Sequence, residues 1–160
     1  MIQRIQSIFL LLVGLIMIIF LFAPIWQKQE ETTGKAYTQT AIYVEKTADA
    51  QAEIAYVFIP FFIPGCLALI AACLALFSIG FYKKRIRQML FSSINTFLIG
   101  GTLVLSAWWA SSAETTVLTN EGGGYQFGLF LPALALFFNV LALRFIRKDE
   151  RLVRSMDRLR

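Results

Sequence analysis

The sequence predicts an all-α membrane protein whose four helices cross a bilayer as a transmembrane bundle. Of its 160 residues, 58% are apolar and only 16% are charged, which lies outside the usual range of soluble domains. The charges are also segregated, so that four long runs carry few or none. A helix needs about 20 apolar residues to cross a hydrocarbon core roughly 30 Å thick. Each run meets or approaches that length.

The four runs set the boundaries within a single membrane domain, residues 1–160. We expect spans at about 6–26, 54–82, 88–113 and 125–146, outer loops at 27–53 and 114–124, and a tail at 147–160. Unpaired backbone polar groups are too costly in lipid, so each span should be helical. The strands of a membrane barrel would alternate apolar and polar residues, and these runs do not. Length and the position of Pro24 favour an uncleaved first span over a signal peptide.

The basic residues predict the orientation. With four spans, both termini and the connection at 83–87 lie on one side of the membrane. All lysines and arginines except Lys28, Lys35 and Lys46 fall on that side, which by the positive-inside rule faces the cytoplasm. The net charge of +5 therefore reflects topology. We expect no nucleic-acid partner, because no basic cluster with stacking aromatic residues is present.

The outer loops favour a small extracytoplasmic β cap on the bundle. Residues 35–46 and 115–119 are rich in residues that favour strands, and the glycines at 122–124 are typical of a turn before the fourth span. We expect these segments to pair into a sheet. An irregular polar loop is the alternative.

The sequence offers little for catalysis. It has no histidine, which removes the commonest metal ligand and general base. No Asp, Glu or Lys lies within a span, so the ionisable group that a pump needs at membrane depth is missing. Cys66 and Cys73 lie roughly 10 Å apart along one helix, too far for a disulfide between them, and are best interpreted as buried small apolar side chains. We expect no enzyme, no cofactor and no catalytic or metal site.

The remaining polar residues at membrane depth are Asn95 and Asn139. Each is expected to hydrogen-bond a neighbouring helix, a contact typically worth about 0.6 to 2 kcal/mol. The sharper alternative is a functional cavity lined by both asparagines.

The tail is a second candidate site. At helical spacing its arginines fall on one stripe and its apolar residues on the opposite one. Because the bases point away from the apolar stripe, we do not expect the tail to dock on lipid. The apolar stripe should pack on protein and leave the arginines for solvent or an acidic partner, with a solvated helix as the alternative. The candidate interaction surface comprises Leu152, Met156, Leu159, Arg147, Arg151, Arg154 and Arg158.

The opening MIQRIQSIFLLL and the closing RFIRKDERLVRSMDRLR resemble the two ends of a four-span membrane protein family of the Bacteroidota, described as a domain of unknown function. The resemblance extends over the whole chain. It implies a multi-pass protein of the bacterial inner membrane with both termini cytoplasmic. It implies no reaction, cofactor or active residue.

These features favour a non-enzymatic scaffold or accessory subunit of an inner-membrane assembly. Besides the lipid bilayer, its expected partner is another membrane protein or a second copy of the chain. The alternative function is a binding or transport module for a lipid or other apolar small molecule, in a cleft opened by a kink at Pro60 and Pro64.

Overall fold

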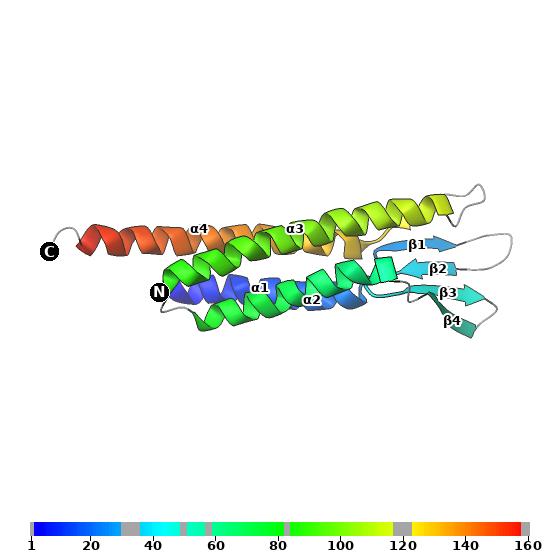
Figure 1. Ribbon diagram of the computed structural model, residues 1–160, viewed down its shortest axis with the longest axis horizontal. Coiled ribbons are helices and arrows are strands. Elements are labelled where there is room, and N and C mark those ends of the chain that lie inside the picture. Colours follow the sequence, from blue (N-terminus) through cyan, green and yellow to red (C-terminus); the bar gives the residue numbers. More distant parts are fainter. Residues whose placement is uncertain are drawn as a thin grey trace.

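The computed structural model describes residues 2–29, 36–48, 51–56, 59–81, 84–116 and 123–157. Within these ranges, four long helices form an antiparallel bundle with a small sheet at one end (Figure 1). All four helices are long and apolar enough to cross a membrane. The predicted four-helix membrane bundle with a β cap is therefore confirmed.

The four helices begin and end close to the charged segments of the sequence. Pro24 follows the end of the first helix, and Pro60 lies in the first turn of the second, where its missing N–H is not needed. A short 3₁₀ helix, η1 (Phe127–Phe130), leads into the fourth. The helices are α1 (Ile2–Phe22), α2 (Ile59–Gly80), α3 (Arg85–Thr116) and α4 (Leu131–Asp157).

The helix bounds differ from the expected spans. α1 begins at Ile2 and ends at Phe22 instead of spanning 6–26, because Trp26 begins β1, and α3 begins at Arg85, before the expected 88. The second span was expected from residue 54, but α2 begins at Ile59 because residues 51–56 form a strand. The fourth was expected from residue 125, but α4 begins at Leu131, after η1. α4 then continues to residue 157, so the tail is helical over that range, as predicted.

The strand expected at residues 115–119 is wrong at its first two positions. Thr115 and Thr116 form the end of α3, and 117–119 lie outside the described residues. Strand preference depends strongly on packing context, and here the helix that precedes these threonines simply continues through them.

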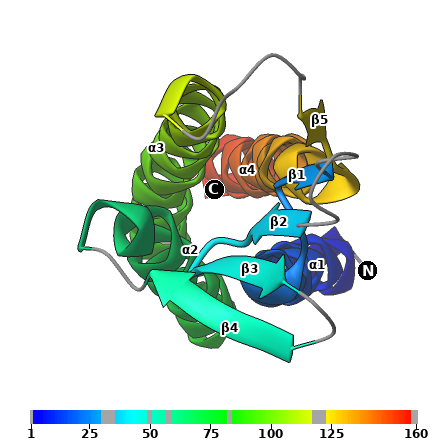
Figure 2. The same cartoon turned by 90° about the vertical axis from the view of Figure 1, so that its right-hand side faces the viewer.

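The helices form a ring in chain order. Each packs against its neighbours in the sequence, and α4 closes the ring against α1, as the view along the bundle shows (Figure 2). We call the end that carries the sheet the sheet end, and the end where α1 starts and α4 finishes the terminal end. At the terminal end α4 projects beyond the other three helices (Figure 1).

The sheet is antiparallel, with strand order β4-β3-β2-β1-β5. The segment expected to form a strand at 35–46 instead covers β2, a tight turn and the start of β3. In that turn the Thr40 hydroxyl donates to the Tyr43 carbonyl at 2.9 Å, and the Thr40 amide donates to the same oxygen. The strands are β1 (Trp26–Gln29), β2 (Ala36–Gln39), β3 (Val44–Ala48), β4 (Gln51–Tyr56) and β5 (Gly124–Tyr125).

Backbone contacts attach the sheet to the bundle. The Ile25 amide donates to the Gln39 carbonyl at 2.7 Å, and the Gln126 amide donates to the Ile25 carbonyl at 2.9 Å. The β2–β3 turn lies against α2 at Gly65, where an added Cβ would come within 2.7 Å of the Ala41 carbonyl oxygen. The end of α1, the sheet and the start of α2 therefore pack as one unit.

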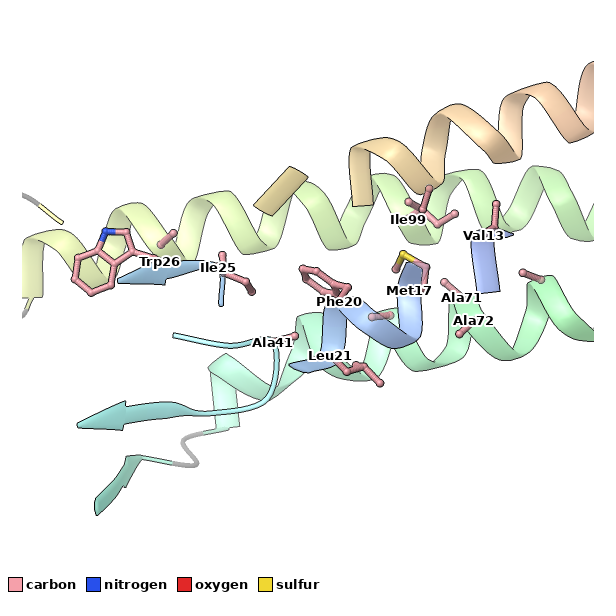
Figure 3. Close-up of a cluster of buried hydrophobic side chains, with 14 residues drawn as sticks. Val13, Met17, Phe20, Leu21, Ile25, Trp26, Ala41, Ala71, Ala72 and Ile99 are labelled. Carbon is pink, nitrogen blue, oxygen red and sulfur yellow. The ribbon is translucent and has the colours of Figure 1, made fainter. Parts of the chain in front are cut away.

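One apolar core runs from the bundle into the sheet. In Figure 3, the buried side chains of Val13, Met17 and Phe20 on α1 are followed along the same axis by Ile25 and Trp26. Trp26 is 1% exposed and lies so close to Gly123 that a Cβ there would overlap its indole ring. The sheet is thus a continuation of the bundle's interior.

Candidate functional site

The buried face of α3 is mostly polar although the helix is long and apolar enough to cross a membrane. Its buried residues recur at intervals of three and four, the spacing of one helix face. The buried face of α2 instead carries four alanines and that of α4 carries two, and small side chains let membrane helices approach closely. The buried residues of α3 are Gln88, Ser92, Asn95, Ile99, Thr102, Ser106 and Ala110.

Asn139 connects α4 to this polar face. Its side chain is fully buried, and its amide nitrogen Nδ2 donates to the Ser92 carbonyl and to Thr96 Oγ1, both at 2.9 Å. Thr96 Oγ1 in turn donates to the same Ser92 carbonyl at 3.0 Å. These contacts fix which levels of α3 and α4 face each other.

Asn95 is also buried, but unlike Asn139 it makes no hydrogen bond to a neighbouring helix within the described chain. Its side chain is 1% exposed, yet neither its Nδ2 nor its Oδ1 has a hydrogen-bond partner within the described chain. Ser92 Oγ and Asn139 Oδ1 are also buried without a partner there. These atoms are uncharged donors and acceptors, which suit water or a neutral polar group. A functional cavity lined by Asn95 and Asn139 stays a prediction.

The chemistry available inside the bundle is limited. Among the buried side chains that the structure describes on α1 to α4, none is charged. In the same parts of the chain, no group of three acidic, Cys or His side chains could hold a metal ion. The buried polar face can therefore donate and accept hydrogen bonds, and it supplies no general acid or base.

Cys73 does not have the buried position expected for it. It is exposed, and Cys66 is half-buried, because the alanine-rich face of α2 points inward and residue 73 lies on the other side. Cys73 lines an open apolar groove of about 440 Å³ on the outer face of α2. The groove lies beyond Pro60 and Pro64, so it is not at the expected proline kink. Its lining residues are Leu69, Ile70, Cys73, Leu74 and Phe77.

The terminal end holds the second candidate site. Arg147, Arg151 and Leu152 of the predicted interaction surface are exposed on α4, with Leu152 at 47%. For Arg154 and Met156 the structure describes no side chain, and Leu159 and Arg158 lie outside the described residues.

Two of these arginines line a pocket together with residues outside the predicted interaction surface. Arg147 and Arg151, together with Glu150 and with Met89 of α3, surround a pocket of about 190 Å³. Next to it, Arg85 of α3 forms an ion pair with Asp149 of α4 at 3.1 Å. Only the contact between α3 and α4 brings Met89 to this place, so no pattern within the tail could have indicated the pocket.

Comparison with protein families matches residues 2–159 to a family model described as a domain of unknown function, DUF4293. The chain belongs to the DUF4293 family. A comparison with curated proteins finds no match. The expected membership of a family of unknown function, over nearly the whole chain, is thus confirmed, while the source organism stays a prediction.

For this DUF4293 chain the geometry separates two kinds of surface. The buried helix faces carry apolar and uncharged polar side chains, whereas exposed charged groups gather at the terminal end. Chemistry that needs charge, such as recognition of an anion or an acidic partner, is therefore available at the terminal end and not at membrane depth.

Proposed function

We propose that this DUF4293 protein is a non-enzymatic scaffold or accessory subunit of a membrane assembly. The observation that carries the proposal is the continuity of η1 and α4. β5 pairs with β1 of the sheet, η1 follows it directly, and α4 then runs unbroken from Leu131 to Asp157. One continuous segment therefore links the sheet to the projecting end of α4 (Figure 1).

Several contacts hold that segment in place along its length. At the sheet end, the Gly128 amide of η1 donates to the Pro24 carbonyl at 3.0 Å. Midway, Asn139 is hydrogen-bonded to α3, and the Phe9 ring of α1 stacks on those of Phe138 and Phe145. A link held at successive levels keeps two surfaces at a fixed separation, which is what a scaffold requires.

The orientation and the membrane are part of the proposal. We place the protein in a bacterial inner membrane with both termini in the cytoplasm, in keeping with the resemblance of its terminal sequences to a Bacteroidota family. The support is the set of exposed bases at the terminal end, because basic residues near span ends favour the cytoplasmic side. These bases are Lys84, Arg87, Arg144, Arg147, Lys148 and Arg151.

The proposed partner surface is the projecting part of α4. Its partner would be another membrane protein or a second copy of the chain, packed on the apolar stripe of Leu152, Met156 and Leu159. The test is cross-linking in native membranes, followed by gentle detergent extraction and mass spectrometry. Recurrent cross-linked proteins or a cross-linked dimer are expected. A lone monomer in repeated extractions would contradict the scaffold.

A matched pair of variants makes this test specific. The Leu152→Ser, Met156→Ser, Leu159→Ser variant removes the apolar stripe and should lose the cross-links. The Leu152→Met, Met156→Leu, Leu159→Met variant keeps both the apolar character and the helix preference and should retain them. If both variants keep the same partners and the same stability, the stripe is solvated and the tail is not the contact surface.

The apolar groove on α2 favours the second candidate function, the binding of a lipid or another apolar small molecule. Its volume of about 440 Å³ lies within the roughly 300–1,000 Å³ typical of small-molecule sites. The Leu69→Trp variant would fill this groove. If it removes a co-purifying apolar molecule that the wild type retains as a monomer, the second function replaces the first.

A further inference from the structure

We propose that the pocket between α3 and α4 at the terminal end binds the phosphate headgroup of an anionic phospholipid, through Arg147 and Arg151. The proposal requires the membrane location of the chain and does not depend on the scaffold role. It assigns a ligand to a site where the sequence indicated only solvent or an acidic protein.

The pocket has the size and lining of a headgroup site. Its volume is about 190 Å³, below the roughly 300–1,000 Å³ of sites that enclose a whole small molecule. Arg147 and Arg151 are one turn apart on α4, so their guanidinium groups extend from the same side of the helix. Guanidinium groups bind phosphate oxygens in a two-pronged geometry that lysine cannot match.

The charges around the pocket favour an anion. Glu150 also lines it, which leaves two cations against one carboxylate. A second acid of α4, Asp149, is paired with Arg85 at 3.1 Å. Arg87 is exposed at the start of α3 and adds positive charge at the same end. An unoccupied pair of arginines in this setting would repel each other, and a bound phosphate would relieve that repulsion.

The pocket lies at the right depth for a lipid headgroup. The Asn139 contact sets residue 139 level with residue 92, and the ion pair sets residue 149 level with residue 85. Arg147 is therefore close to the level where the charges of α3 begin and its apolar stretch starts. Toward the membrane centre, Leu143 and Val140 lie on the same side of α4 as Arg147. A lipid with its phosphate in the pocket would have its acyl chains along that surface.

A lipid is favoured over an acidic protein because the pocket is at the membrane boundary. Basic pockets between membrane helices on the side with anionic lipid are a recurrent kind of headgroup site. The Met89 side chain adds an apolar wall, which suits a glycerol backbone more than a solvated peptide. The proposed ligand class is thus a glycerophospholipid with a net negative charge.

The test measures lipid binding to the purified full chain in dodecyl maltoside by native mass spectrometry. Phosphatidylglycerol is titrated against phosphatidylcholine of the same acyl chains. The Arg147→Gln, Arg151→Gln variant should bind phosphatidylglycerol more weakly by on the order of tenfold or more, with phosphatidylcholine binding unchanged. The Glu150→Gln variant should bind phosphatidylglycerol more tightly, which tests the site without removing an arginine.

The matched control is the Arg144→Gln, Lys148→Gln variant. It removes the same charge from exposed positions of the same helix that do not line the pocket, and it should retain most of the phosphatidylglycerol binding. Equal losses in the two double variants would mean that only diffuse charge matters and would overturn the proposal. So would a Glu150→Gln variant that binds no tighter, or inorganic phosphate that binds the wild type as well as the lipid does.

Discussion

The contact between Asn139 and α3 gives the most quantitative prediction. Replacing Asn139 with Ala removes two interhelical hydrogen bonds, one to the Ser92 carbonyl and one to Thr96 Oγ1. Side-chain hydrogen bonds between membrane helices average about 0.6 kcal/mol and reach about 1.7 kcal/mol. The two together should contribute about 1 to 2 kcal/mol, or a factor of roughly 5 to 30 in the unfolding equilibrium.

The structure also limits how large the effect can be. After the substitution, Thr96 Oγ1 still donates to the Ser92 carbonyl, so no buried donor loses its last partner. The additional penalty of an unsatisfied buried group, about 1 to 3 kcal/mol, is therefore avoided. A loss well above 3 kcal/mol would mean that Asn139 has a further partner.

Asn95 is the matched control for this measurement. It is the same residue type, equally buried, and its side-chain atoms have no partner within the described residues. Asn95→Ala removes the same atoms without removing a hydrogen bond, so it should cost at least about 1 kcal/mol less than Asn139→Ala. Unfolding in mixed micelles of dodecyl sulfate and dodecyl maltoside, followed by far-ultraviolet circular dichroism, measures both.

A double-mutant cycle isolates the contact itself. Combining Asn139→Ala with Thr96→Val should show a coupling energy of about 0.5 to 1 kcal/mol, since the two side chains bond directly. Two results would refute the reasoning: a coupling energy of zero, or an Asn139→Ala variant no less stable than Asn95→Ala.

Further predictions concern the attachment of the sheet and the terminal end. Gly65→Ala places a Cβ within 2.7 Å of the Ala41 carbonyl oxygen, so it should cost roughly 1 to 3 kcal/mol and expose the β2–β3 turn to limited proteolysis. Gly100→Ala meets no atom within 4 Å and should be neutral or stabilising by up to about 1 kcal/mol; equal effects of the two would contradict the packing of the turn on α2. Arg85→Gln removes the ion pair with Asp149 and leaves the buried Asp149 Oδ2 without its cation, so it should cost more than the roughly 1 kcal/mol upper value of an exposed pair, with a smaller loss at high salt. A salt-independent loss would show that Arg85 acts through packing.

The helices were predictable because a single physical requirement determines them. A segment must supply about 20 apolar residues to cross the bilayer, and the charges at 28, 83–87 and 144–160 leave few ways to satisfy that requirement. The composition of residues 35–46 also indicated that this segment forms a strand. It placed this segment in one strand because the turn at Thr40 depends on a local hydroxyl contact, and threonine favours strands as well.

The rest of the sheet was not predictable from composition. Three of the four residues of β1 are glutamine or lysine, which are not among the residues enriched in strands. β1 is held by its antiparallel pairing with β2 and by the adjoining hydrogen bond from the Ile25 amide to the Gln39 carbonyl. The sequence of β4 includes Ile54 and Tyr56, which were assigned to the next span on apolarity alone. Each of these strands forms through its pairing with a neighbouring strand, and the local amino-acid composition does not indicate that pairing.

The candidate sites likewise combine features that the sequence indicates with features that depend on how the helices pack. The spacing of the buried polar residues on α3 is visible in the sequence, but which asparagine finds a partner depends on the register of α3 against α4. Asn139 and Asn95 are alike in type and depth, and only the structure separates them. The pocket beside Arg147 likewise requires Met89 from another helix.

The proposed scaffold requires a continuous connection across a bilayer, with the sheet and the terminal end on opposite sides. Thiol labelling tests it directly. The native thiols are first removed by Cys66→Ala and Cys73→Ala. Gln27 is exposed on β1 and Lys148 is exposed on α4, so each is replaced by cysteine in turn, as Gln27→Cys and Lys148→Cys. In right-side-out inner-membrane vesicles, a membrane-impermeant maleimide should label Gln27→Cys at once and Lys148→Cys only after permeabilisation. Labelling of both without permeabilisation would contradict the crossing of the membrane between them, and labelling of Lys148→Cys alone would reverse the proposed orientation.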